Sequence, residues 1–142
     1  MSDKLNLDKL AAQKGQAIVK QNRDAGRQPE DVDNLVTKAL GILQENGVYA
    51  CGLYLLSRTQ DKEQAIARVV SAQVVELLAA LPFGWGRPQK DTREDEALLA
   101  FLSNKVAGDA KLERLLLAKE TLEQMLIYAR YGAKAWKATG GD

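Results

Sequence analysis

The sequence predicts an all-α fold, a compact bundle of about five to six helices, and three observations support this. The 142 residues include only three prolines, which leaves long stretches free of this helix breaker. Within those stretches apolar residues recur every three or four positions, the period of one face of a helix. With 46% apolar and 27% charged residues, the composition is that of one globular domain. We therefore expect residues 1–142 to form a single helical domain.

The first three helices are predicted over residues 5–25, 29–44 and 48–58. Gly26 stands where a helix often closes with glycine, and Pro29 followed by two acids suits a first helical turn. The segments flanking Asn46-Gly47 keep a 3.6-residue period, which favours a helix–helix turn there over a hairpin turn. The third segment is apolar all round, so we expect it to be the most buried element.

A fourth helix, capped by Thr59 or Asp61, is predicted to end at Pro82. Its apolar face would consist of Ala65, Ile66, Val69, Val70, Val74, Leu77, Leu78 and Leu81. Residues 82–91 then form a flexible loop, in which Trp85 between two glycines is expected to be exposed.

The remaining chain predicts two more helices. Thr92 and Asp95 have the spacing of a capping box and lead into an apolar face with Ala97, Leu98, Phe101 and Leu102. Gly108-Asp109 precedes a long last helix, and residues 138–142 are expected to fray. One side of that helix would carry Leu112, Leu115, Leu116, Leu122, Met125, Leu126, Ala129, Ala133 and Trp136.

The residue inventory excludes several kinds of chemistry. There is no histidine, so histidine-based triads and the commonest metal ligand are missing, and the single Cys51 cannot form an intramolecular disulfide. Acidic residues cluster at three places where helix dipoles or a solvated face explain them more simply than chemistry does: Glu30 and Asp31; Glu94, Asp95 and Glu96; Glu120 and Glu123. We expect no catalytic residue, no metal and no cofactor; a helical enzyme using these carboxylates with a divalent metal is an alternative from another class.

The location of the protein is also bounded by the sequence. The longest uncharged stretch, residues 46–57, is too short to cross a bilayer. The first residues, Met-Ser-Asp-Lys, lack the basic and then apolar layout of a signal peptide. We therefore expect a cytoplasmic protein without a membrane partner.

Basic residues form one row on the predicted first helix. Steps of four and three residues connect the members of this row, which contains no acid: Lys9, Gln13, Gln16, Lys20, Arg23 and Arg27. Such a row can bind phosphates without reading bases, and an ordinary solvated face is the alternative. A second cluster on the last helix consists of Arg130, Lys134 and Lys137, with Tyr128 and Tyr131 nearby for stacking or packing. We predict RNA contacts by Lys9, Lys20, Arg23, Arg27, Arg130, Lys134 and Lys137.

Two stretches resemble a known family. Residues 40–58, LGILQENGVYACGLYLLSR, combine an apolar helix, Asn-Gly, a second apolar helix and a closing basic residue. Residues 115–136, LLLAKETLEQMLIYARYGAKAW, combine a glutamate, an aromatic residue and a basic-then-aromatic run. Together with the helix order, they are similar to the Cmr small subunit, the all-helical small subunit of type III-B CRISPR effector complexes. Departures at Val48, Tyr128, Tyr131 and the loop at residues 83–88 leave open a related branch such as type III-D.

The resemblance implies a non-catalytic subunit that stacks head to tail in several copies beside other subunits of the complex. Its basic faces would hold the target RNA and the guide–target duplex independently of sequence. The alternative is a helical protein–protein adaptor without nucleic-acid contact, which docks through Phe83 and Trp85.

Overall fold

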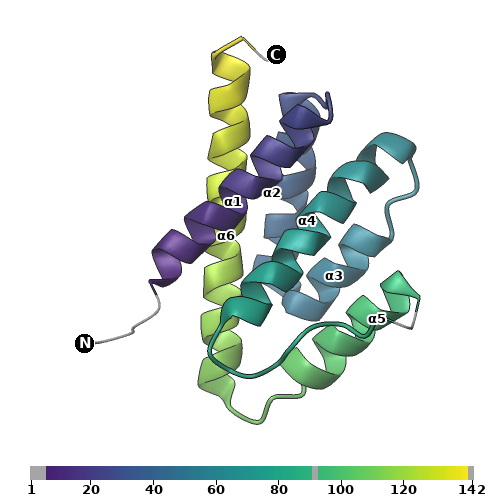
Figure 1. Ribbon diagram of the computed structural model, residues 1–142, viewed down its shortest axis with the longest axis vertical. Coiled ribbons are helices and arrows are strands. Elements are labelled where there is room, and N and C mark those ends of the chain that lie inside the picture. The colour runs from purple at the N-terminus through teal and green to yellow at the C-terminus, as the bar shows by residue number, and fades with distance from the viewer. Residues whose placement is uncertain (1–5, 91–92, 141–142) are drawn as a thin grey trace.

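Helices account for most of the computed structural model, which describes residues 6–90 and 93–140 (Figure 1). In chain order they are α1 (Leu7–Asp24), α2 (Pro29–Asn46), α3 (Val48–Leu56), α4 (Asp61–Ala80), α5 (Glu94–Ala100), the π-helix η1 (Phe101–Val106) and α6 (Leu112–Ala138). No strand occurs within the described ranges, so the predicted all-α fold is confirmed.

The long helix α6 is the support on which α1 and α2 pack. Figure 1 shows α1 crossing α6 obliquely, with α4 beside α1 and α3 next to α2 and α4. The chain between α4 and α5 passes across the end of the bundle near the start of α6. Buried apolar side chains from all seven helical segments form one continuous cluster, which includes Ile18, Leu43, Cys51, Leu77, Leu98, Leu102 and Leu122. This cluster is the hydrophobic core.

Glycine permits the close crossing of α1 and α6. A Cβ at Gly15 would lie 2.9 Å from the carbonyl oxygen of Met125 and 3.0 Å from the Cβ of Tyr128. Four residues along α1, Val19 packs against Gly132 of α6, where an added Cβ would be 3.0 Å from Val19 Cγ2. The two helix backbones therefore approach more closely than larger side chains would allow.

The helix ends agree with the predictions in some places and differ in others. Gly26 and Gly47 follow α1 and α2 with φ of +79° and +95°, which confirms the glycine stops. Gln60 is the N-cap of α4 and makes no side-chain capping bond, so the predicted caps at Thr59 and Asp61 are wrong. The acids in that first turn favour the helix by their charge instead.

The predicted capping box before α5 also differs from the structure. Arg93 is the N-cap and makes no side-chain capping bond, and the Asp95 carboxylate accepts from the backbone N–H of Glu96 at 2.9 Å. Thr92, the other half of the box, lies outside the described residues.

Helix α3 is not the most buried element, contrary to the prediction. Tyr49 and Leu53 are 38% and 44% exposed, and the fully buried residues of α3 are Cys51, Gly52 and Leu55. The helix packs against α2 and α4 on one side and against α5 and η1 on another, and its third side lacks a neighbour within the described chain. An apolar sequence alone does not place a helix at the centre of a bundle.

The start of α6 is exposed for a related reason. Leu112 and Leu116, predicted to lie on the buried side, are 66% and 52% exposed. Lys119 Nζ already reaches the backbone oxygen of Gln44, near the end of α2, at 3.1 Å. The preceding turns of α6 therefore extend past the helix that would cover them.

Candidate nucleic-acid interface

The basic row of α1 lies on the surface. Lys9, Gln13, Gln16, Lys20 and Arg23 are all exposed, because the opposite face of α1 packs into the core through Leu10, Ala11, Ile18 and Val19. Neither Lys9 nor Arg23 forms an ion pair with any residue that the structure describes. In this surface, the α1 row, Lys9 and Arg23 are therefore exposed cations without an ion-pair partner among the described residues.

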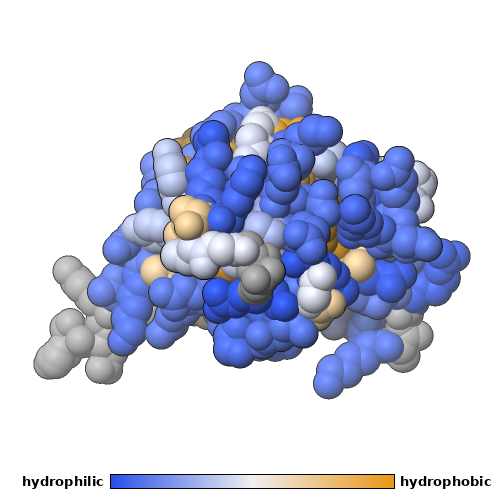
Figure 2. Space-filling view, turned by 90° about the horizontal axis from the view of Figure 1, so that it is seen from above, coloured by the Kyte–Doolittle hydropathy of each residue, from blue (hydrophilic) through white to orange (hydrophobic). Residues whose placement is uncertain are grey.

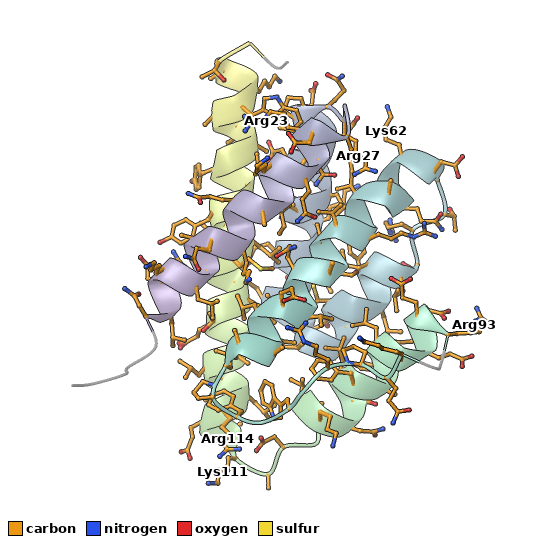
Figure 3. The ribbon with its side chains drawn as sticks, in the orientation of Figure 1. Arg23, Arg27, Lys62, Arg93, Lys111 and Arg114 are labelled. Carbon is orange, nitrogen blue, oxygen red and sulfur yellow. The ribbon has the colours of Figure 1, made fainter. Side chains whose placement is uncertain are left out.

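Arg27 departs from this row. It follows the helix, is half-buried, and donates from Nη1 to Asn22 Oδ1 at 3.1 Å. The buried Asn22 side chain in turn donates to the carbonyl of Ile18 at 2.7 Å. Arg23 and Arg27 share one end of α1 in Figure 3, but Arg27 helps to close the turn toward α2. The neutral Asn22 amide leaves the charge of Arg27 in place, so Arg27 remains a predicted phosphate contact that is less exposed than the rest of the row.

An acid lies closer to the row than its sequence position suggested. Lys20 Nζ contacts Asp24 Oδ2 at 2.8 Å, and this hydrogen bond lowers the pKa of Asp24 below its ordinary value. The two side chains are 69% and 62% exposed, so the pair is weak and solvent competes for both partners. Lys20 can exchange this partner for a phosphate.

A groove of about 500 Å³ separates the α1 row from α6. Tyr128 and Gly132 line its α6 side, and the α1 side consists of Gln13, Gln16, Ala17, Val19, Lys20 and Arg23. The Tyr128 hydroxyl donates to the carboxylate of Asp8, which holds the ring against α1. The α1 spacing predicted one wall of this groove, but nothing local in the sequence indicated that Gly132 would face it.

The cations of the second basic cluster lie near acids of α2. Lys134 Nζ lies 3.1 Å from Asp33 Oδ2, and Arg130 Nε lies 3.9 Å from Asp33 Oδ1. Lys137 Nζ is 3.7 Å from Glu30 Oε1. These cations hold α6 to the first turns of α2, on the flank of α6 away from the groove. The structure therefore does not bring the two basic clusters together.

The loop aromatics are also held by the protein itself. Trp85 is only 6% exposed, and its Nε1 donates to Asp109 Oδ2 at 2.8 Å. Phe83 packs edge-to-face on Trp85 at 5.0 Å, and the Arg114 guanidinium lies 5.2 Å from the Phe83 ring centre. Positive φ at the glycines on both sides of Trp85 turns the ring inward. The expectation of an exposed Trp85 is wrong.

The carboxylate of Asp109 is stabilised in its ionised form. The backbone N–H of Lys111 donates to Asp109 Oδ1 at 2.8 Å, and this bond, together with the Trp85 bond, lowers the pKa of Asp109 below its ordinary value. Arg114 adds an ion pair at 3.4 Å. Asp109 thus fastens the loop before α5 to the turn before α6.

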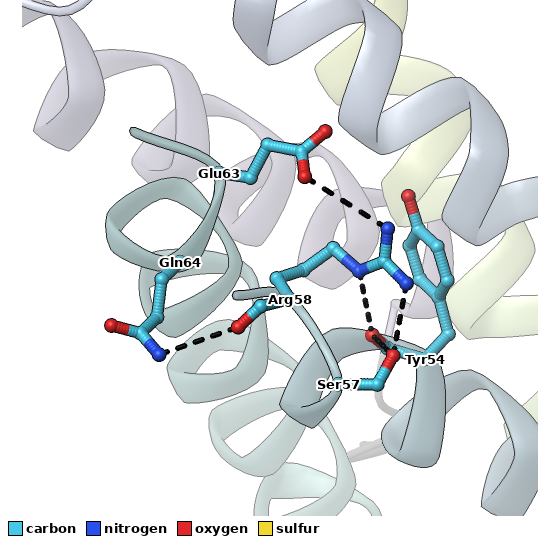
Figure 4. Close-up of polar contacts among 5 residues, drawn as sticks. All are labelled: Tyr54, Ser57, Arg58, Glu63 and Gln64. Atoms are coloured by element: carbon cyan, nitrogen blue, oxygen red, sulfur yellow. Dashed lines mark hydrogen bonds and ion pairs between the residues drawn. The ribbon is translucent and has the colours of Figure 1, made fainter. Parts of the chain in front are cut away.

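The basic residue that closes α3 has a structural role. Arg58 stacks 4.1 Å from the centre of the Tyr54 ring and donates to the Tyr54 carbonyl and to Ser57 Oγ (Figure 4). Glu63 lies 3.9 Å from its guanidinium, and Gln64 donates to its carbonyl. Burial raises the pKa of Tyr54. This network connects the end of α3 to the start of α4.

The acidic clusters are used locally. Asp31 pairs with Lys62, Asp95 with Arg93, and Glu123 with Lys119. Among residues 6–90 and 93–140, no three His, Cys, Asp or Glu side chains lie close enough together to hold a metal ion. No helix in those ranges is both long and apolar enough to cross a bilayer.

A larger hollow of about 750 Å³ lies between α4 and α5. Its lining contains both basic and acidic side chains: Arg68, Lys90 and Arg93, and Glu76, Glu94 and Asp95. By contrast, the charged side chains lining the α1–α6 groove are all cations. The groove is therefore the stronger candidate for an anionic ligand.

Comparison of the chain with protein-family models, curated proteins and solved structures gives no match. Its function is therefore inferred from its own geometry.

Proposed function

We propose that this protein is a non-catalytic, RNA-binding small subunit of a cytoplasmic type III CRISPR effector complex. The observation that carries the RNA-binding part is the α1 row, one exposed helix face on which Lys9 and Arg23 are unpaired among the described residues and Lys20 has only an exposed partner, Asp24. Lys and Arg release counterions from phosphates, and such contacts position a strand without reading its bases. The resemblance of residues 40–58 and 115–136 to the Cmr small subunit supports the type of complex.

The proposed phosphate contacts are Lys9, Lys20 and Arg23. Arg27 ranks below these three because it is half-buried and donates to Asn22, and the α6 cluster ranks below them because all three of its cations have acids of α2 as partners. The net charge of only +1 means that attraction to a strand depends on this local distribution.

The proposal includes contacts with other subunits and with further copies of the chain. Two pairs of exposed apolar side chains support it: Leu112 with Leu116 on α6, and Tyr49 with Leu53 on α3. Repetition of the subunit along one strand would raise a weak single-copy affinity. A helical adaptor that docks through Phe83 and Trp85 is disfavoured, because those rings pack on each other and on Arg114.

A salt titration of RNA binding tests this proposal. The ligand is an unstructured single-stranded RNA of about forty nucleotides, long enough for several copies. The wild type is compared with Lys20→Ala/Arg23→Ala and with the matched control Lys38→Ala/Arg68→Ala, whose cations are exposed and unpaired among the described residues but lie on α2 and α4. We expect the first variant to bind more weakly, with a slope of log K against log salt shallower by about 1.4 for two lost single-strand contacts.

The control variant should match the wild type, although it loses the same charge. Arg130→Ala/Lys134→Ala should lower thermal stability and leave the salt slope unchanged, because those cations serve the α2 contact. Equal losses of RNA affinity in Lys20→Ala/Arg23→Ala and in Lys38→Ala/Arg68→Ala would show that only the net charge matters, which would contradict a phosphate contact on α1. Absence of binding by the wild type at low salt would contradict the proposal outright.

A further inference from the structure

We propose that the groove between α1 and α6 holds one unpaired nucleotide of the bound strand, with its base on Tyr128 and its phosphate at Lys20 and Arg23. This inference rests on the proposed function and adds to it a binding position for one base. It makes the protein a binder of single strands in preference to duplexes.

The groove has the size of a ligand site. Its volume of about 500 Å³ lies within the range of roughly 300–1,000 Å³ typical of small-molecule pockets. Ala17 contributes only a methyl group to the lining, and Val19 packs over Gly132.

The two ends of the groove differ in chemistry. Gln13 and Gln16 line one end, and Lys20 and Arg23 line the other, over roughly 15 Å of helix. Tyr128 belongs to the amide end, because its Cβ lies beside Gly15 and its hydroxyl reaches Asp8. Amides and an aromatic ring suit a base and its ribose, whereas the cations suit a phosphate.

Gly132 lies toward the cationic end, since it packs against Val19, one turn before Arg23. Figure 3 shows Arg23 at the end of α1 that lies near the C-terminal part of α6, and Figure 2 shows this end of the molecule to be mainly hydrophilic. The rest of the strand can therefore leave the groove across a hydrophilic surface.

The groups in the groove are available and already in place. Within the described chain, the Gln13 and Gln16 side chains have no hydrogen-bond partner. The Tyr128 ring is half-buried and fixed by its bond to Asp8, so little side-chain entropy is lost when a base stacks on it. In a duplex the bases are stacked inside the helix and cannot reach such a ring, which is why an unpaired nucleotide is required.

Binding of intact and abasic RNA to Tyr128 variants tests this inference. Tyr128→Leu keeps an apolar side chain but removes the ring, and Tyr128→Phe keeps the ring. The matched control is Tyr131→Leu, since Tyr131 is 60% exposed on the same helix and does not line the groove. We expect Tyr128→Leu to weaken single-strand binding about tenfold with an unchanged salt slope, and the other two to remain near the wild type.

An abasic strand of equal length should bind the wild type about tenfold more weakly than the intact strand, and Tyr128→Leu should weaken that binding no further. A blunt duplex should bind less tightly than the single strand. Equal affinity for intact and abasic strands, or for duplex and single strand, would overturn the inference, as would a free mononucleotide that binds as tightly as the strand.

These outcomes separate the inference from the proposed function. If binding depends on Lys20 and Arg23 but not on Tyr128 or on bases, the proposed base-binding position on Tyr128 is wrong, and the proposed phosphate contacts on α1 are retained. If no strand binds, both are wrong. Should Tyr128→Leu fail to fold in a thermal melt, Gln13→Ala/Gln16→Ala replaces it, because both side chains are exposed and their loss must also weaken intact but not abasic RNA.

Discussion

At the scale of single residues, the partner of a side chain decides its role. Trp85 is buried with its Nε1 donating to Asp109, and Arg27 is half-buried with its Nη1 donating to Asn22. Lys20 differs, since its carboxylate partner is exposed and readily exchanged. Exposed charge is thus available on α1 only where no buried acceptor competes for it.

The Asp109 contacts predict how stability changes at acid pH. Because its pKa in the folded protein lies below the ordinary value of 3.8, ionised Asp109 stabilises the fold above that pH. The contribution is lost as the pH falls through the lower, folded-state value. Asp109→Asn keeps one acceptor oxygen, for either Trp85 Nε1 or the Lys111 N–H, and loses the second acceptor and the charge, so its free energy of unfolding should be lower than that of the wild type at neutral pH.

Urea unfolding followed by tryptophan fluorescence, from neutral pH to below about pH 3, measures this difference. The gap between wild type and variant should close as the pH falls. Asp24 and Glu76 also have lowered pKa values, but they affect the stability of wild type and variant alike and therefore cancel in the difference between the two. A gap that is constant with pH would show that the charge of Asp109 does not stabilise the fold.

At the scale of elements, the spacing between α1 and α6 sets the depth of the groove. Gly15 and Gly132 each face the opposing helix at a distance that excludes a Cβ without movement. The same crossing brings Tyr128 beside the amides of α1 and Gly132 beside Val19. The packing of two helices and the shape of the candidate site therefore depend on the same residues.

Substitution of Gly15 by alanine tests this crossing. The added Cβ would meet backbone atoms of Met125 and Ala129, so we expect a loss of about 1–3 kcal/mol in the free energy of unfolding. The matched control is Gly41→Ala in α2, where an added Cβ would meet no neighbouring group within 4 Å and should stabilise the helix by about 0.5–1 kcal/mol. Chemical denaturation of both variants gives the comparison, and equal shifts would refute tight packing at Gly15.

At the scale of the whole molecule, opposite charges are sorted among the helices. Cations at the end of α6 meet the acids that begin α2, and the cations of α1 face solvent and the groove. A chain whose total charge is only +1 thus retains a local surface suited to an anionic strand. The large exposed apolar side chains lie elsewhere, on α3 and at the start of α6, apart from Tyr131.

The single thiol reports on opening of the whole molecule. Cys51 is 5% exposed in the core, and burial raises its pKa to about 12. Since the thiolate is the reactive form, alkylation by iodoacetamide should be far slower in the native protein than in denaturant. Mass spectrometry of labelled protein measures the rate, and Gly15→Ala should speed labelling by about tenfold for each 1.4 kcal/mol of stability that it loses. Labelling at the rate of a free thiol in native buffer would contradict the buried position.

The sequence by itself determined the all-α class, most helix bounds and the exposed row on α1. Periodicity, proline and the glycines at positions 26 and 47 are local features, and they act over a few residues wherever the helix lies. The exposed position of Lys9, Lys20 and Arg23 follows from the same period, because the opposite face of α1 is apolar.

Only the tertiary structure decided which elements became neighbours. Lys134 bonds to Asp33, 101 positions away in the sequence, and Trp85 bonds to Asp109, 24 positions away. Gly132 packs against Val19 of another helix. The same holds for α3, whose apolar face remains open because no helix within the described chain covers it. Pairing, burial and groove formation depend on contacts between distant segments, and such contacts leave no periodic signal in the sequence around either partner.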